Sequence, residues 1–296
     1  MSLTINHNLM AANATRNLTS AYGDLATSTR RLSSGLRVDT AADDAAGLAI
    51  RELMRSDIAS LNQGVRNAND AISLIQTADG ALQVIDEKLI RMKELAEQAA
   101  TGTYTSDQRM IIDSEYQAMA SEITRIANAT DFNGIYLLNG NLSGDTHDGT
   151  GMVATGKLKV HFGTANDSAE DYYYIKIGTS TASALGVGNQ SVEGDGYSIS
   201  TQDGAQKALV ALNDAIVSKD KIRANLGALQ NRLENTITNL EIQSENVQAA
   251  ESRISDVDVA TEMTNYTSKQ ILAQSAVAML SQANSLPQMA LSLLQG

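Results

Sequence analysis

The chain has 296 residues, a single proline, no cysteine, 4% aromatic residues and a formal net charge of −12. The lack of cysteine excludes disulfides and cysteine-ligated metal sites, and the acidic balance argues against nucleic acid as a partner because phosphates would be repelled. No run of about 20 apolar residues occurs, so no segment is expected to span a membrane, while the scarcity of proline permits long helices.

The first predicted helix carries small and apolar residues at steps of three and four, with one polar member: Ala11, Ala14, Leu18, Ala21, Leu25, Ser28 and Leu32. This spacing is typical of the seam of a coiled coil. The run Ser33–Gly35 is a helix stop. Residues 37–46 are small, polar and acidic, and we interpret them as a non-helical or loosely helical connector.

A second helix is predicted from about residue 44 to residue 100, where Gly102 follows. Its seam continues over eight turns and more: Leu61, Val65, Ala68, Ile72, Ile75, Leu82, Ile85, Leu89, Met92, Ala96 and Ala99, with Asp79 at the one missing step. So long a stripe must be covered by partner helices along its length. Residues 105–107 have cap-type side chains and begin a third helix, with a seam at Ile112, Tyr116, Met119, Ile123 and Ile126.

The middle of the chain changes character. Asn133-Gly134 and Asn139-Gly140 are hairpin-turn signals around residues 135–138. Alternating apolar residues predict strands over 158–162 and 173–177, joined by a turn at 163–171. Residues 140–156 and 178–204 are rich in Gly, Ser, Thr and Asp and are expected to be loops.

Helical spacing returns at about residue 203 and continues to residue 257. A final seam follows at Leu272, Ala276, Met279, Ala283, Leu286, Ala290 and Leu293. The fold is therefore predicted to be mainly α: a long discontinuous helical bundle, formed by the N- and C-terminal halves, with a small β-hairpin region. The simplest packing pairs the first seam with the last. Such a pair, with alanine at alternate positions, buries little surface and needs neighbouring copies for stability.

Several blocks of sequence, in order along the chain, resemble bacterial flagellin. They include INHNLMAANATRNL (5–18), LSSGLRVDTAADDAAGLAI (32–50), DFNGIYLLNG (131–140), ESRISDVDVATEM (251–263) and ILAQSAVAMLSQANSLPQMALSLL (271–294). The resemblance covers essentially the whole length. Because the DFNG turn and the returning helix are separated by little more than the hairpin, we expect a short form without large outer domains.

The resemblance implies a structural subunit that polymerises into the hollow helical filament of the bacterial flagellum. Residues 1–38 and 257–296 would form the inner terminal coiled-coil domain, and residues 39–256 the second helical domain, with its β-hairpin region at about 131–202. Residues 1–12 lack a standard secretory signal, and the family instead leaves the cell unfolded through the flagellar type III apparatus. The expected location is thus the extracellular filament.

The same resemblance implies several partners. These are other copies of the chain, the flagellar cap and hook–filament junction proteins, an export chaperone at the C-terminal helix, and Toll-like receptor 5. For the receptor, the positions that match the family's innate-immune epitope are Arg91, Leu95 and Glu115. We expect the apolar seam residues to become buried on polymerisation: Leu18, Leu25, Leu32, Leu272, Met279, Leu286 and Leu293.

No enzyme motif is found, since the chain has no HExxH, GxSxG, P-loop or GxGxxG pattern, and its three histidines lie far apart in the sequence. We therefore expect no catalysis, no cofactor, no metal site and no membrane partner. Two alternatives stay open at this point. One is a hook–filament junction protein, which has similar ends; the other is a secreted helical adhesin or effector that does not assemble.

Overall fold

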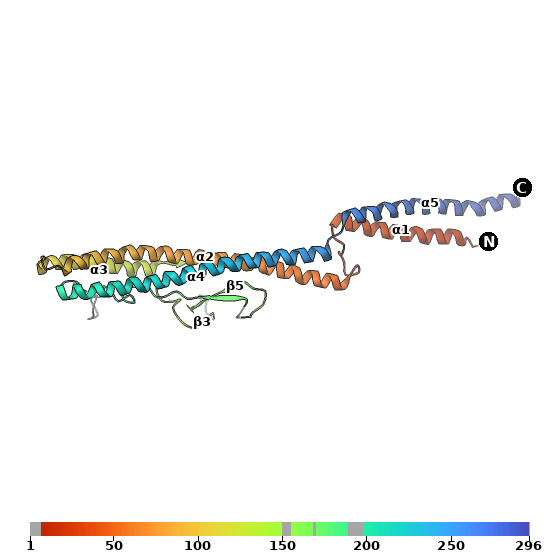
Figure 1. The fold of residues 1–296 in the computed structure, drawn as a ribbon. Coiled ribbons are helices and arrows are strands. Elements are labelled where there is room, and N and C mark those ends of the chain that lie inside the picture. The colour runs from red at the N-terminus through yellow and green to blue at the C-terminus, as the bar shows by residue number, and fades with distance from the viewer. Residues whose placement is uncertain (1–6, 150–154, 168–169, 189–197, 296) are drawn as a thin grey trace. The chain divides into compact units, whose positions relative to one another are not determined.

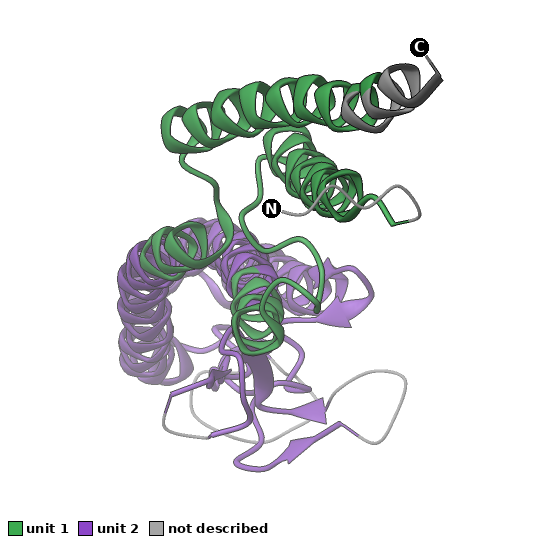
Figure 2. Ribbon diagram, turned by 90° about the vertical axis from the view of Figure 1, so that its right-hand side faces the viewer, with its two compact units in different colours: residues 1–58, 245–296 green, residues 59–244 purple. Residues whose placement is uncertain are grey.

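The computed structural model describes residues 7–149, 155–167, 170–188 and 198–295, with the backbone alone for 286–288 and 290–295. The chain divides into two compact units, Met1–Ile58 with Glu245–Gly296 and Ala59–Ser244 (Figure 2). The boundary expected from the resemblance, at residues 38 and 257, falls inside the first unit and stays a prediction about layers of the filament.

The first unit is built on two helices from opposite ends of the chain. Helix α1 (Leu9–Ser34) and helix α5 (Val259–Gln295) lie side by side and antiparallel (Figure 1). The start of α1 and the end of α5 therefore lie at the same end of the pair. Helix α1 ends at Gly35, whose φ of 74° is the left-handed conformation that favours glycine. The pairing of the two terminal segments predicted from the sequence is therefore confirmed.

The second unit contains a bundle formed by one whole helix and most of two others, together with the described strands. Helix α2 (Ala45–Ala100) matches the predicted long helix to within a residue, and the bundle also contains α3 (Ser106–Ala129) and α4 (Gln202–Ser255). Thr105 caps α3 in a capping box with Gln108, because each side chain bonds the other's backbone N–H. The predicted seam of α2 is the core of the unit, where Leu82, Ile85 and Leu89 are fully buried.

Ion pairs fix how α4 lies against α2. Asp79, which interrupts the apolar seam of α2, accepts hydrogen bonds from Arg223 of α4 at 2.7 and 3.2 Å. One heptad along α2, Asp86 pairs with Lys219, whose side chain is only 1% exposed. A buried ammonium needs such a partner, so these pairs select one register for the antiparallel helices.

The middle segment forms three two-stranded antiparallel sheets rather than one. Strands β1 (Asp131–Phe132) and β2 (Ile135–Tyr136) flank Asn133-Gly134, and both turn residues have positive φ, as the sequence predicted. Strands β3 (His147–Asp148) and β4 (Thr155–Gly156) pair within the segment 140–156, where only a loop was expected. The prediction there was wrong because strands of two residues show no alternation to detect.

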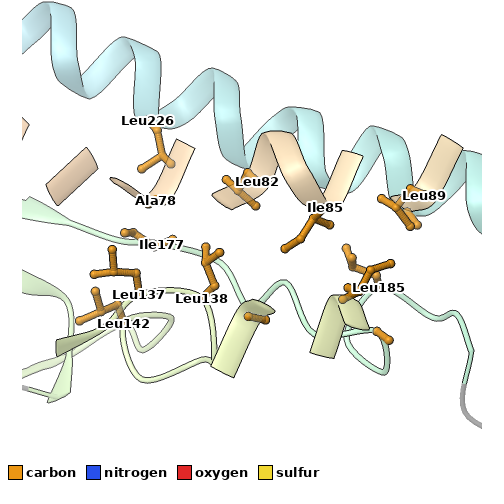
Figure 3. Close-up of a cluster of buried hydrophobic side chains, with 14 of the residues drawn as sticks. Ala78, Leu82, Ile85, Leu89, Leu137, Leu138, Leu142, Ile177, Leu185 and Leu226 are labelled. Atoms are coloured by element: carbon orange, nitrogen blue, oxygen red, sulfur yellow. The ribbon is translucent and has the colours of Figure 1, made fainter. Parts of the chain in front are cut away.

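The main hairpin packs one face on the bundle. Strands β5 (Leu158–His161) and β6 (Tyr172–Ile175) pair with Val160 opposite Tyr173, so the two predicted strands are confirmed. The hairpin approaches α2 where Gly64 leaves room for the Phe162 carbonyl, and the Asn67 amide donates to the His161 carbonyl at 2.8 Å. Nearby, apolar residues of segments 137–142 and 177–185 cover the α2 seam (Figure 3).

Candidate assembly surface on the terminal helix pair

The contact between α1 and α5 is a narrow strip of mostly small side chains. On α1 the least exposed positions include the seven of the predicted seam, with Ala21 and Ser28 buried and Leu18, Leu25 and Leu32 half-buried. On α5 the face toward α1 is a different heptad series: Glu262, Tyr266, Lys269, Ala273, Ala276, Leu280 and Ala283. Alanine predominates in the second half of that series, so the helices can approach closely while burying little apolar area.

The seam predicted for α5 is therefore only partly the one that packs on α1. Ala276 and Ala283 belong to both series, but Leu272 is 53% exposed and Met279 is 60% exposed. The side chains of Leu286 and Leu293 lie outside the described residues. The prediction failed because α5 carries apolar residues around most of its circumference, so that spacing alone does not identify which stripe meets the partner helix.

A polar contact closes the end of the pair near both termini. Pro287 has no backbone N–H, so the Ala283 carbonyl, four residues earlier, lacks its helical donor. The Asn8 side chain donates to that carbonyl at 2.8 Å, while its Oδ1 accepts from the Ala11 N–H and caps α1. Asn8 thus satisfies one unpaired group on each helix, a role that the sequence analysis missed although Pro287 was its signal.

The opposite end is fixed by the connector between α1 and α2. Leu36 forms a β-bridge with Asp256, and the Val257 N–H donates to the Gly35 carbonyl at 3.0 Å. Between these two ends Lys269 pairs with Asp24 at 2.7 Å. The register of α1 against α5 is therefore set by backbone and polar contacts, because a seam of small residues alone would allow sliding.

Charged side chains hold the connector itself. The Arg51 guanidinium, only 8% exposed, donates to the Val38 carbonyl at 2.7 Å. Asp43 accepts from the Thr40 hydroxyl at 2.8 Å and pairs with Arg30 at 3.1 Å. The Thr40 hydrogen bonds, assisted by the charges of Arg30 and Arg31, hold the pKa of Asp43 below its usual value.

Large apolar side chains are also exposed on the outer surface of the pair. On α5 they are Val259, Met263, Ile271, Leu272, Val277, Met279 and Met289, each 47% to 60% exposed, and on α1 they include Leu9, which is 70% exposed. So many exposed large apolar side chains, on an acidic chain, are typical of an interface with other molecules. The candidate functional site is this exposed surface of α1 and α5, which we call the terminal apolar surface.

The predicted receptor epitope lies elsewhere, on the second unit, and its three residues do not form one surface. The Arg91 guanidinium donates to Glu115 Oε1 at 2.8 and 3.0 Å and also pairs with Glu94. These hydrogen bonds, with Glu94 first, raise the pKa of Arg91. Leu95, however, is 1% exposed and lies in the core. Leu95 therefore faces the bundle interior, and the epitope of Arg91, Leu95 and Glu115 stays a prediction.

The described residues contain neither a membrane-spanning helix nor a cluster of metal-binding side chains. Within the described ranges no helix is long and apolar enough to cross a bilayer. In the same part of the chain no three His, Cys, Asp or Glu side chains gather in a way that could hold a metal ion.

Two family descriptions match the chain: the bacterial flagellin N-terminal helical region over residues 5–143 and the bacterial flagellin C-terminal helical region over residues 209–294. The flagellar filament 33 kDa core protein of Treponema phagedenis is 43% identical over 296 residues, which cover 99% of this chain and 100% of that protein. The flagellin of Halalkalibacterium halodurans is 41% identical over 293 residues, with the same coverage. Among solved structures, the crystal structure of Bacillus cereus flagellin is 30% identical, with a TM-score of 0.46, over 63% of this chain and 94% of that one.

Proposed function

The chain belongs to the bacterial flagellin family and is a structural subunit of the flagellar filament, and we propose that the terminal apolar surface is where copies join. The observation that carries the proposal is the chemistry of α5. Its α1-facing strip is small, while Leu272 and Met279 stay more than half exposed on another side. Those side chains have an apolar environment only if another copy supplies it.

Burial of this surface contributes to the energy of assembly. Complete burial of a leucine or methionine side chain contributes ~1.5–3 kcal/mol relative to exposure. Leu272 and Met279 are already about half buried, so covering them contributes about 2–3 kcal/mol together. That gain opposes the repulsion between copies that each carry a net charge of −12.

The proposal extends to the layers and to the seam residues. Residues 1–38 and 257–296 form the inner layer of the filament, and residues 39–256 form the layer around it. Leu18, Leu25 and Leu32, half-buried against α5, complete their burial in the filament, together with Leu272, Met279, Leu286 and Leu293. The chain acts through packing alone, without catalysis.

The test compares two variants in which a pair of exposed apolar side chains is replaced by serine. Leu272→Ser/Met279→Ser removes two exposed apolar groups of the terminal pair, and Val210→Ser/Val217→Ser removes two from α4, which are 63% and 51% exposed. Purified monomer is seeded with filament fragments, and the critical concentration is measured by sedimentation and electron microscopy. We expect the first variant to raise the critical concentration roughly 30- to 150-fold, which corresponds to about 2–3 kcal/mol.

The control variant should leave the critical concentration within a few fold. Equal losses in both variants would refute a special role of the terminal pair. Wild-type chain that forms no tubes at any concentration would refute the filament function itself.

The same surface supports one partner before assembly. Export of flagellins through the type III apparatus is typical of the family, and a cytoplasmic monomer with an exposed apolar helix is prone to aggregation. We propose that the export chaperone covers α5 from Leu272 to Leu293. Co-purification of the chaperone with wild-type chain, but not with Leu272→Ser/Met279→Ser, is the expected result. The cap and the hook–filament junction proteins are proposed to contact the terminal pair in the same way as another copy does.

Toll-like receptor 5 is proposed to bind the Arg91–Glu115 pair on the surface of α2 and α3. The two side chains are 49% and 44% exposed, and together they present an ordered charged pair. Arg91→Ala and Glu115→Ala monomers should activate receptor-bearing reporter cells less than wild type. Leu95→Val, a change in the core, should leave activation unchanged in a chain that folds. Unchanged activation by both charge variants would rule out this site.

A further inference from the structure

A groove on the second unit has an apolar floor and cationic ends. It lies between β6 and α4, has a volume of about 500 Å³, and is lined by Tyr174, Lys176, Ile222, Ala228, Leu229 and Arg232, among others. Ile222 and Leu229 are partly exposed although they pack on the core. The fold leaves this groove unfilled, so a ligand for it would need an apolar group near a negative charge.

The outer face of the hairpin extends the positive charge of the groove. The register of β5 and β6 places Lys159 opposite Tyr174 on the face away from the bundle, and Lys157 and Lys176 flank them on the same face. The Lys157 ammonium lies 5.3 Å from the centre of the Tyr174 ring, and the Lys159 ammonium 3.6 Å from the Tyr172 ring. These cation–π contacts hold the lysines close to the strand surface rather than extended into solvent.

Acidic partners for this face are scarce. Lys176 pairs with Asp145 from a neighbouring loop. Among the described residues, neither Lys157 nor Lys159 has a carboxylate within 4.0 Å. Three lysines and one carboxylate, Asp145, in the described part of a chain of net charge −12 form a surface that attracts a second acidic molecule.

A complementary surface exists on α3 of the same chain. Met110 and Ile111 are 58% and 72% exposed, the latter the largest exposure among the large apolar residues of the described chain. They lie beside Asp107 and Glu115 on the outer face of α3. Glu115 uses only its Oε1 atom for Arg91, so this surface, which we call the α3 knob, combines two apolar side chains with carboxylates.

The α3 knob and the groove cannot meet within one molecule. Arg91 contacts Glu115 of α3, and Lys93 contacts Asn213 of α4, which places Met110 level with about residue 210 of α4. The groove is centred near residue 227 of α4, about 25 Å farther along the bundle at ~1.5 Å per residue. Contacts between two different patches of identical chains generate rings where the rotation closes and open helical filaments where it does not, so such a contact is compatible with a filament.

We propose that the α3 knob of one copy docks into the groove between β6 and α4 of the next copy, with its carboxylates against Lys157, Lys159 and Lys176. The inference rests on the proposed function, because it assigns a second contact to a chain that polymerises. Met110 and Ile111 fill the apolar floor, and Tyr174, which is 39% exposed, packs beside them.

The absence of cysteine makes a direct test possible. A double variant, Ile111→Cys with Ala228→Cys, places one thiol on the knob and one in the groove, and both positions are exposed. A disulfide requires Cα atoms within about 7 Å, so one molecule cannot form it across about 25 Å. Seeded filaments of the variant are oxidised gently and separated by denaturing electrophoresis without reductant. The matched control is Ile111→Cys with Glu234→Cys, since Glu234 is exposed and lies about 120° around α4 from Ala228.

We expect a ladder of covalent multimers from the Ile111→Cys/Ala228→Cys filaments and at least tenfold less from the control. Free monomers of both variants, oxidised at the same concentration, should remain single chains. Intact filaments in which the groove pair cross-links no better than the control would overturn the proposed contact and leave the filament function standing. Failure of the wild-type chain to polymerise would instead overturn the filament function, and this contact with it.

A second variant measures the contribution of the knob. Met110→Ser/Ile111→Ser changes only exposed side chains, so monomer unfolding should stay within about 0.5 kcal/mol of wild type. The critical concentration should rise at least tenfold, and an unchanged value would contradict the inference.

Discussion

Gly64 is the point where the hairpin rests on α2, and its replacement by alanine should separate the two. An added Cβ would lie 2.0 Å from the Phe162 carbonyl oxygen and 2.8 Å from its carbonyl carbon. An ordinary carbon–oxygen contact is about 3.3 Å, so the strand would have to retreat by about 1.3 Å. Both atoms belong to backbone, which cannot rotate away as a flexible side chain would.

The expected magnitude follows from the neighbouring contacts. A retreat of about 1.3 Å would lengthen the 2.8 Å hydrogen bond from Asn67 to the His161 carbonyl beyond hydrogen-bonding range, a loss of about 1 kcal/mol. Phe162, 2% exposed and 4.7 Å from Tyr173 between ring centres, would lose packing worth about 1–3 kcal/mol. Together these losses are about 2–4 kcal/mol. Alanine is favoured over glycine in a helix by about 1 kcal/mol, which offsets part of the loss, so Gly64→Ala should destabilise the monomer by about 1–3 kcal/mol in total.

The same helix provides the control. Nothing lies within 4 Å of a Cβ added at Gly80, which is exposed, so Gly80→Ala should stabilise the monomer by about 0.5–1 kcal/mol. Urea unfolding of both variants gives the stabilities, and amide exchange of residues 158–161 and 172–175 reports hairpin docking. Equal stabilisation by the two substitutions, with unchanged exchange in the hairpin, would refute the close approach at Gly64.

Three further predictions concern polar contacts. Asn8→Ala should weaken the terminal pair by about 2 kcal/mol, because both the helix cap and the donor to the Ala283 carbonyl are lost. Asn8→Asp keeps the cap and loses only the donor, so it should cost about half as much. Amide exchange in α1 measures both effects. Asp86→Ala should destabilise by about 1–3 kcal/mol in urea unfolding, because it leaves Lys219, which is 1% exposed, with only the exposed Asp220 as an ion-pair partner at 2.8 Å among the described residues. Lys219→Met should cost less, because the Asp86 carboxylate that it leaves behind is 27% exposed. Because the folded state depresses the pKa of Asp43, ionised Asp43 stabilises the connector above the ordinary pKa of 3.8, and this stabilisation is lost as the pH falls below that value. At such a low pH, cleavage of the wild-type chain between residues 35 and 44 by an acid-active protease should increase. The variant Asp43→Asn should be equally susceptible at pH 3 and pH 6.

The helices could be predicted closely because each one carries its own signal. The seam of α2 repeats over many turns, and Gly102 and Thr105 mark where the chain breaks and begins again. The β5–β6 hairpin could be predicted equally well, since apolar and polar residues alternate on both strands. These are local patterns, and local patterns follow from backbone geometry and the burial of one face.

The candidate site was less predictable at the level of single residues. The heptad spacing of α5 fits two stripes, and only the partner helix decides that Tyr266, Ala273 and Leu280 face inward while Leu272 and Met279 face out. Leu95 illustrates the same limit, because its spacing from Arg91 places it near that residue but leaves its burial open. The contact of Asn8 with Ala283 joins residues 275 positions apart: Pro287 marks the carbonyl that lacks a donor, but no local pattern identifies Asn8 as that donor.

The sequence by itself determined the mainly helical class, the pairing of the two ends, the hairpin and the family, because periodicity, caps and turn residues act over a few positions and ordered blocks persist along the chain. The tertiary structure alone decided which stripe of α5 meets α1, the buried Asp86–Lys219 pair, the space at Gly64 and the separation of knob from groove. These features depend on which atoms from distant segments come within contact distance. The register of the packed helices decides that, and no local sequence pattern specifies it.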